Sequence, residues 1–179
     1  MKTSWTRKQQ WALFCMGIWL CGTVCTAVVA MQNFYTIDRL LAGSTNASFH
    51  AAADKLGQPL AREFLRYLSS ELNRLYFQWW NLAQTAVGLV VLWLAAQLPR
   101  SRKAAWGVAG MLVVALILTA ALTPPIVSIG RSLDFVPRDP PPPELRTFGL
   151  LHAAFSVLTL FNLILGVLTT RWIQRAGES

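Results

Sequence analysis

FQWWNLAQTAVGLVVLWLAAQL (residues 77–98), PRSRK (99–103) and AAWGVAGMLVVALILTAALT (104–123) are the consecutive stretches of sequence that decide the fold. An α-helix rises about 1.5 Å per residue, so about 20 apolar residues match the roughly 30 Å hydrocarbon core of a bilayer. Both apolar stretches reach that length, and in lipid such a run can satisfy its backbone hydrogen bonds only as a helix. Because the link between them is so short, the sequence predicts an antiparallel pair of membrane-spanning helices.

Two further apolar runs of spanning length, residues 11–31 and 148–170, flank this pair. The composition agrees with a membrane protein, because 54% of the residues are hydrophobic and only 13% are charged. We therefore expect an all-α fold, an integral membrane four-helix bundle in which residues 1–179 form a single membrane domain. Two long outer loops, residues 32–76 and 124–147, would join the first span to the second and the third to the fourth.

The net charge of +8 arises from basic residues that cluster beside the ends of the apolar runs. This placement favours contact with lipid headgroups, so we expect the bilayer as a partner and no binding of nucleic acid. Positive residues in short segments next to spans mark the cytoplasmic side of a membrane protein, and we therefore expect cytoplasmic N- and C-termini. We also expect an integral location in the cell's inner membrane. The short segments on the side of the termini contain Lys2, Arg7, Lys8, Arg100, Arg102, Lys103, Arg171 and Arg175.

The first outer segment contains helical patterns of its own. Residues 33–41 can extend the first helix beyond the membrane, with Gly43 and Ser44 ending it and residues 43–46 forming a turn. After Pro59, apolar residues recur every three or four positions, which predicts an outer amphipathic helix leading into the second span. That helix can cover the bundle or lie on the membrane surface. Its apolar residues are Leu60, Phe64, Leu68, Leu72 and Leu75.

The second outer segment is rich in proline. Pro124 and Pro125 are expected to end the third helix, because proline lacks the backbone N–H that a helix interior requires. Pro137 and the run 140–143 then favour a stiff, extended strap that ends where the fourth helix begins, at Glu144.

Polar residues within the spans are the candidates for function. At 100° per residue, one face of the second helix and one face of the fourth each carry a polar stripe, and we expect both stripes to face the bundle interior. Where the two stripes meet, their polar side chains would either hold the helices together by hydrogen bonds or line a small polar vestibule. In such a vestibule His152 would exchange protons or bind an ion. The candidate cluster is Arg74, Gln78, Asn81, His152 and Ser156. The remaining stripe residues are Thr85 and Gly88 on the second helix and Thr159, Asn162, Gly166 and Thr170 on the fourth.

Recognisable catalytic and metal-binding motifs are missing from the sequence. It contains no glycine-rich phosphate loop, nucleophile elbow or metalloprotease histidine pair. The cysteines, Cys15, Cys21 and Cys25, all lie in the first apolar run without nearby histidine or carboxylate, so we expect neither a disulfide framework nor a metal site. We therefore expect no enzyme activity, catalytic residue, cofactor or bound metal.

Several short motifs resemble the bacterial domain-of-unknown-function 4149 family, which is related to eukaryotic transmembrane protein 205. They are RLYF (74–77) opening the second span, TPP (123–125) ending the third, Gly130 with Arg131 beyond it, and FGLLHAAFS (148–156) opening the fourth. The resemblance covers the last three spans well and the first more loosely. It implies a four-helix membrane protein, and the eukaryotic branch is linked to metal-drug resistance and trafficking.

Three functions are compatible with these patterns. The first is a non-enzymatic accessory or assembly subunit of a larger membrane complex, with other membrane-protein subunits as partners. The alternative is a small transporter or permeation protein that uses the outer polar cluster, in which His152 and Asn81 would be essential. A third hypothesis is a membrane enzyme that acts on lipid through His152.

Overall fold

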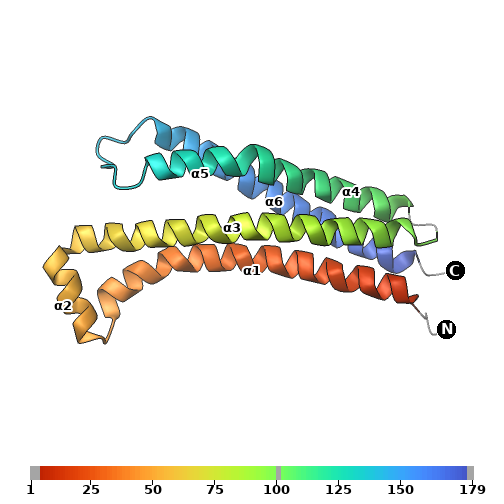
Figure 1. The fold of residues 1–179 in the computed structure, drawn as a ribbon, viewed down its shortest axis with the longest axis horizontal. Helices are drawn as coiled ribbons and strands as arrows, with labels where there is room; N and C mark the ends of the chain where they lie inside the picture. The colour runs from red at the N-terminus through yellow and green to blue at the C-terminus, as the bar shows by residue number, and fades with distance from the viewer. Residues whose placement is uncertain (1–4, 100–101, 177–179) are drawn as a thin grey trace.

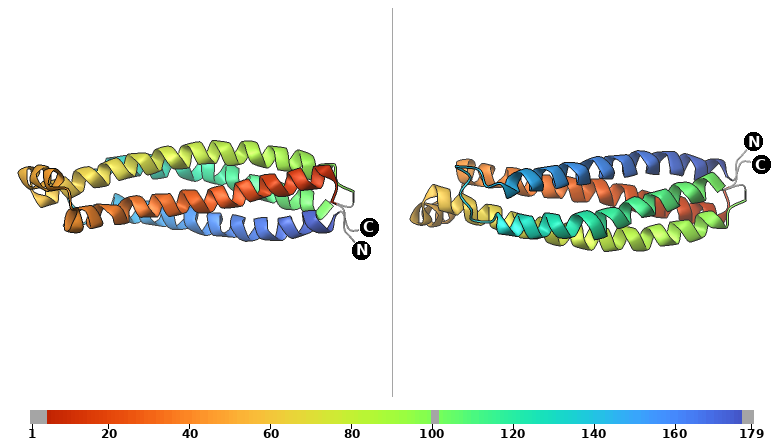
Figure 2. Two further views of the ribbon diagram at one scale, coloured as in Figure 1. Left: turned by 90° about the horizontal axis from the view of Figure 1, so that it is seen from below. Right: turned by 90° about the horizontal axis from the view of Figure 1, so that it is seen from above.

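The computed structural model describes residues 5–99 and 102–176, which form a bundle of long helices and, within those ranges, no strand (Figures 1 and 2). Four continuous helical segments are long and apolar enough to cross a membrane, which confirms the predicted all-α bundle with four spans. The helices are α1 (Arg7–Gly43), α2 (Ala47–Leu56), α3 (Gln58–Ala96), α4 (Arg102–Leu116), η1 (Ile117–Leu122), α5 (Thr123–Ser132) and α6 (Glu144–Arg175). The third span consists of α4, η1 and α5 together.

The four spans are arranged as a ring in the order α1, α3, α4, α6. Helix α1 packs against α3 and α6, and α4 packs against the same two neighbours. Helices α3 and α6 consequently stand at opposite corners of the ring with their backbones apart, although Phe77 of α3 reaches Phe155 of α6 with 5.5 Å between the ring centroids. This arrangement matters for the site, because the two polar stripes predicted from the sequence belong to these two opposite helices.

Large side chains fill the interior of the ring. Met16 and Trp19 from α1, Val91 from α3 and Met111 from α4 are all fully buried. At one end of the bundle, the Gln9 side chain of α1 donates hydrogen bonds of 2.8 Å to the carbonyls of the last turn of α6. The start of α1 and the end of α6 therefore lie together. We call the opposite end of the bundle, where α2 lies, the arm end.

The first outer segment, residues 32–76, is almost entirely helical, in agreement with the helical patterns predicted within it. Helix α1 continues to Gly43 and is capped by Ser44, as expected, and Asn46 caps α2 by accepting a hydrogen bond from the Phe49 N–H at 3.0 Å. Gly57 has a positive φ of 80°, which glycine adopts readily, and it turns the chain into α3. The predicted amphipathic helix is the first part of α3 and runs without a break into the second span.

The outer parts of α1 and α3 form a projecting pair with α2 at its tip (Figure 1). We call this feature the outer arm and define it as residues 33–43 of α1, α2, and residues 58–74 of α3. The α3 part alone has a length of about 24 Å at 1.5 Å per residue. Towards the same end, the pair α5 and α6 diverges from the pair α1 and α3.

The prolines at positions 124 and 125 do not end the third helix, which corrects the prediction for residues 124–147. The helix widens instead into the π-helical turn η1, where the Thr123 N–H bonds to the Leu118 carbonyl five residues earlier. This widening accommodates the two prolines, because a proline ring clashes with the carbonyl four residues before it and provides no donor. Helix α5 then continues to Ser132. A non-helical strap follows, and α6 begins at Glu144 as predicted.

Candidate functional site

A chain of buried hydrogen bonds starts at Asn81, which is only 2% exposed. The Asn81 amide donates to the Thr123 hydroxyl at 2.9 Å, and its carbonyl oxygen accepts from the Gln84 amide at 2.9 Å. The Gln84 carbonyl oxygen accepts from the Trp19 indole at 3.1 Å, and the Thr123 hydroxyl donates to the Leu118 carbonyl at 2.7 Å. The chain therefore connects α1, α3 and the π-helical turn through side chains that all have partners.

This hydrogen-bonded chain favours one alignment of the three helices. Interhelical hydrogen bonds in membranes each contribute about 1 kcal/mol, while an unpartnered buried amide costs more than its partnered form gains. Sliding α3 along α1 would separate Gln84 from Trp19 and leave the Gln84 carbonyl oxygen and the Trp19 indole N–H without partners. The structure thus supports the packing interpretation of Asn81.

A groove of about 630 Å³ lies beside this chain, between α3 and the η1–α5 segment. Asn81 and Thr123 are part of its lining, and Thr119 and Ser128 add further hydroxyl groups. The lining also includes apolar walls and one arginine. The complete lining is Gln78, Asn81, Leu82, Thr119, Thr123, Pro124, Val127, Ser128 and Arg131.

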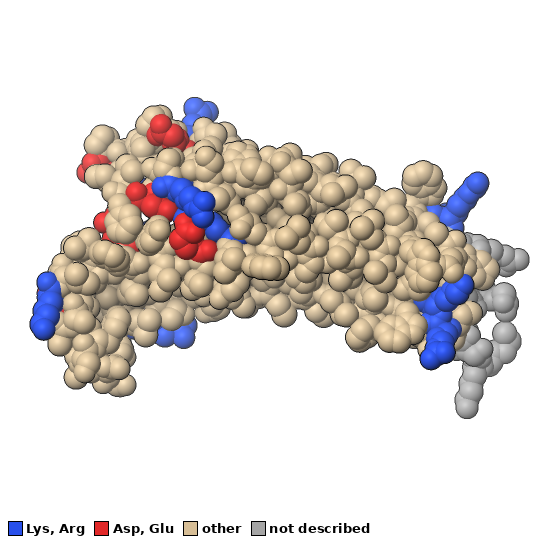
Figure 3. All heavy atoms as spheres, in the orientation of Figure 1, with Lys and Arg blue, Asp and Glu red and all other residues tan. Residues whose placement is uncertain are grey.

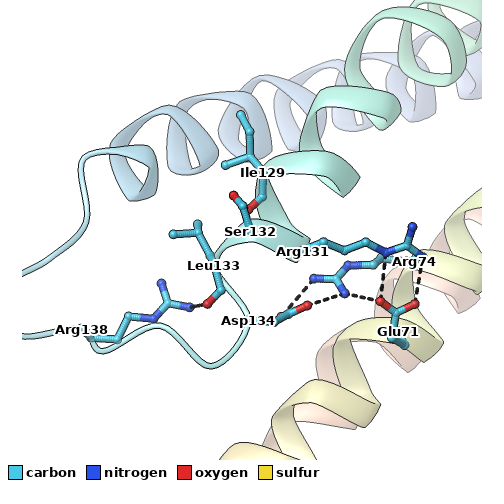
Figure 4. A network of polar contacts seen from close by, with 8 residues as sticks. All are labelled: Glu71, Arg74, Ile129, Arg131, Ser132, Leu133, Asp134 and Arg138. Atoms are coloured by element: carbon cyan, nitrogen blue, oxygen red, sulfur yellow. Dashed lines mark hydrogen bonds and ion pairs between the residues drawn. The ribbon is translucent and has the colours of Figure 1, made fainter.

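Four charged side chains form a cluster that joins α3 to α5 and to the turn after it, above this groove (Figure 4). Arg74 donates to both carboxylate oxygens of Asp134 at 2.8 and 3.1 Å and to Glu71 at 2.5 Å. Arg131 donates to both oxygens of Glu71 at 3.1 Å. The hydrogen bonds from Arg131 and then Arg74 lower the pKa of Glu71 below its ordinary value of about 4.5. We call these four residues the ion-pair cluster.

Gly130 is tightly packed where α5 passes the ion-pair cluster. A methyl group in place of its hydrogen would lie 3.2 Å from a guanidinium nitrogen of Arg74 and 3.3 Å from the Phe148 ring. These distances are shorter than ordinary van der Waals contacts, so with alanine the neighbours would have to shift by a few tenths of an ångström. The glycine thus allows α5 and α3 to approach closely here.

The predicted meeting of Asn81 with His152 and Ser156 does not occur. His152 and Ser156 are exposed on α6, the Ser156 hydroxyl donates to the His152 carbonyl at 2.9 Å, and the His152 ring stacks on Phe148 at 5.9 Å. The buried side of α6 carries Gly166 of the predicted stripe, Asn162 at its edge and, in addition, Thr169. At 100° per residue Asn162 lies roughly a quarter turn from His152, which explains the error.

Of the predicted cluster, the structure brings Gln78 and Asn81 to the groove and Arg74 to the ion-pair cluster next to it. Sequence reasoning missed Gln84 and Thr123 as partners of Asn81, and Trp19 as the partner of Gln84. The available signal was Gln84 itself, a second amide one helical turn after Asn81 in an otherwise apolar run.

Groups that could hold a metal ion are not found among residues 5–99 and 102–176, where no three His, Cys, Asp or Glu side chains gather. All three cysteines are free thiols. The polar groups of the site are amides, hydroxyls and arginines, which bind by hydrogen bonding and charge.

The four long apolar helical segments fit the class of multi-pass helical membrane proteins. No protein-family model, curated protein or solved structure matches the chain.

Proposed function

We propose that this protein is a non-enzymatic accessory subunit of a membrane complex and that it contacts its partner subunit through the outer arm. The observation that supports the proposal is an apolar surface on the outer arm. The arm extends beyond the part of the bundle that has no charged side chains, which we call the charge-free belt. A bare apolar surface of this kind in water is typical of a protein–protein contact site.

The charge-free belt locates the bilayer along the bundle. Helix α3 and the residues after it have no charged side chain between Arg74 and position 100, which corresponds to about 37 Å at 1.5 Å per residue. Residues 104–130 and 147–170 of the third and fourth spans give similar lengths, about 40 and 36 Å. A bilayer is about 40 to 45 Å thick with its headgroups, so Arg74 lies at the level of the headgroups and the part of α3 that precedes it extends towards water.

The outer arm presents its apolar residues outward and its small and polar residues inward. Ala61, Ser69 and Asn73 of α3 are buried against α1. The predicted apolar stripe faces away from α1, with Leu60, Phe64 and Leu68 at 41%, 51% and 55% exposure. Phe64 also packs edge-on against Phe135 of the strap, with 5.6 Å between the ring centroids, so the stripe is partly covered there. Its remaining exposed area, to which Leu60 and Leu68 contribute, stays available to a partner.

Hydrogen bonds hold the two helices of the arm together before any partner binds. The Asn73 amide donates to the Ala30 carbonyl at 2.9 Å, and the Asn33 amide donates to the Asn73 side chain at 2.7 Å. Farther from the spans, Arg62 and Asp38 form a solvent-exposed ion pair at 2.8 Å. A preformed arm loses little conformational entropy on binding, which favours association. Its exposed stripe suits an uncharged, apolar helical surface.

A permeation path through the bundle has less support. Asn81 is buried next to α1 and η1, whereas His152 is exposed on the helix at the opposite corner. The bundle centre is occupied by Trp19, Met16 and Met111. The accessory role needs neither an open path nor a shared site of Asn81 and His152.

Orientation and family are part of the same proposal. At the end where α1 starts, the visible face shows basic side chains, whereas at the arm end acidic and basic side chains are mixed (Figure 3). This distribution supports cytoplasmic termini in a bacterial inner membrane, with the arm on the outer side. The resemblance to the domain-of-unknown-function 4149 family supports the same four-span arrangement.

The test is site-specific photo-crosslinking in native membranes. A photoreactive residue in place of Phe64 or Leu68 should give a discrete adduct with a second protein. The same residue in place of Trp106, which is 74% exposed within the third span, should react with lipid alone. If position 64 reacted with lipid only, or gave only an adduct of twice the mass of this chain, the proposal that the arm binds a different protein would be contradicted.

A further inference from the structure

We infer that the groove between α3 and η1–α5 binds a phospholipid from the leaflet at the arm end. The phosphate would lie at Arg131, the ester groups at Gln78 and Ser128, and an acyl chain along Leu82 and Val127. This site does not require the partner subunit.

The groove covers the right range of membrane depth for such a ligand. Its lining on the third span runs from Thr119 to Arg131, a rise of about 18 Å at 1.5 Å per residue. Arg131 stands where the charge-free belt ends, at the level of the headgroups, and Thr119 lies within the belt. The groove therefore reaches from the headgroup region into the hydrocarbon, as a phospholipid molecule does.

The upper part of the groove offers donors without partners. The side chains of Gln78 and Ser128 are exposed and form no hydrogen bond with any residue in 5–99 or 102–176. Arg131 has five N–H donors, and its two hydrogen bonds with Glu71 leave three. Phosphate and ester oxygens can only accept hydrogen bonds, so they complement this set of donors.

Charge and apolarity select a lipid over a free anion. The ion-pair cluster has two arginines and two carboxylates, and Glu71 and Asp134 already receive hydrogen bonds from those arginines. This balance gives little net attraction for a free phosphate ion. Leu82, at 62% exposure, and Val127 add an apolar wall that only a ligand with a hydrocarbon part can use.

Native mass spectrometry of the full chain, stripped of lipid in mild detergent and then titrated with dioleoyl phosphatidylglycerol, tests this site. The unchanged protein should retain one lipid. Arg131→Gln should weaken retention about tenfold, the loss expected for one charge-assisted contact. The double variant Gln78→Ala with Ser128→Ala should weaken it similarly. These two side chains have no protein partner, so the fold should not depend on them.

Arg62→Gln is the matched control, because Arg62 is also an exposed arginine paired with one carboxylate and lies on the arm, away from the groove. It should retain lipid as the unchanged protein does. Equal loss in Arg62→Gln and Arg131→Gln would overturn the inference, as would retention that no variant changes. Displacement of the lipid by millimolar inorganic phosphate would overturn it in favour of a free-anion site.

Discussion

Asn81 and Thr123 are joined by a 2.9 Å hydrogen bond between the second span and the residue that follows the π-helical turn. Thr123 can accept this bond while its own hydroxyl donates to the Leu118 carbonyl at 2.7 Å. The Thr123 N–H bonds to the same carbonyl, five residues back instead of four. The irregularity caused by the two prolines and the buried amide of α3 therefore form one connected feature.

Replacing Asn81 by leucine should lower the free energy of unfolding by about 1 to 3 kcal/mol, because it leaves the Gln84 amide buried without its acceptor. Tryptophan fluorescence during denaturation with sodium dodecyl sulfate would measure the change. His152→Leu is the control, since His152 is exposed on the opposite helix, and it should leave stability almost unchanged. Equal effects of the two variants would contradict the assigned role of Asn81.

Replacing Gly88 by alanine should destabilise the bundle. The added methyl group would lie 2.6 Å from the buried ring of Trp19 and 2.5 Å from Leu112, so the ring must move away from Gln84. Gly17→Ala is the matched control, because open space surrounds that glycine in the same bundle. Gly17→Ala should leave the stability of the protein unchanged or raise it by up to about 1 kcal/mol, because alanine favours a helix over glycine by about that amount. Thermal unfolding of both variants would check this difference, and an equally stable Gly88→Ala protein would contradict the packing.

The sequence determined the spans but not the direction in which each helix faces. The lengths of the four runs follow from the bilayer thickness alone, and the end of α1 follows from the local chemistry of Gly43 and Ser44. A helical wheel gives the angle between His152 and Asn162, yet which of them faces inward depends on where neighbouring helices stand. That depends on the ring order, in which α3 and α6 are opposite.

A further error and an alternative that the sequence left open have the same kind of origin. Pro124 was expected to end a helix because the rule assumes hydrogen bonds between residues four apart, and a π-helical turn relaxes that assumption. For the stripe of Leu60, Phe64 and Leu68, the sequence leaves two surroundings open, the protein and the membrane. Within the stripe, Phe64 packs on another part of the chain, at Phe135, and the side of α3 that approaches α1 carries small residues such as Ser69.

Replacing Asn73 by alanine should loosen the arm without unfolding the spans. The variant loses the bonds to the Ala30 carbonyl and the Asn33 side chain, which connect the two helices near the base of the arm. Hydrogen exchange of residues 33–43 should become faster, while exchange of residues 11–25 stays unchanged. Arg62→Gln, which removes the exposed ion pair with Asp38, should have a smaller effect. Faster exchange along all of α1 would contradict a local role of Asn73.

Acidification should weaken the contact between α3 and α5 through Glu71. Hydrogen bonds from Arg131 and then Arg74 keep the pKa of Glu71 below its ordinary value of about 4.5 in the folded protein. Between that value and the lower folded pKa, the unfolded chain binds a proton that the folded chain does not, so stability falls as the pH falls. The contribution is fully present above the ordinary value and is lost as the pH drops through the folded pKa.

Unfolding measured from neutral pH downward would test this contribution of Glu71. Glu71→Gln should be less stable than the unchanged protein at neutral pH, because the arginines lose an ionised partner, and it should lose less stability on acidification. Asp38, whose pKa is also lowered by its hydrogen bond from Arg62, should account for part of the remaining pH dependence. Parallel pH profiles for Glu71→Gln and the unchanged protein would show that the ion-pair cluster does not link the two helices energetically.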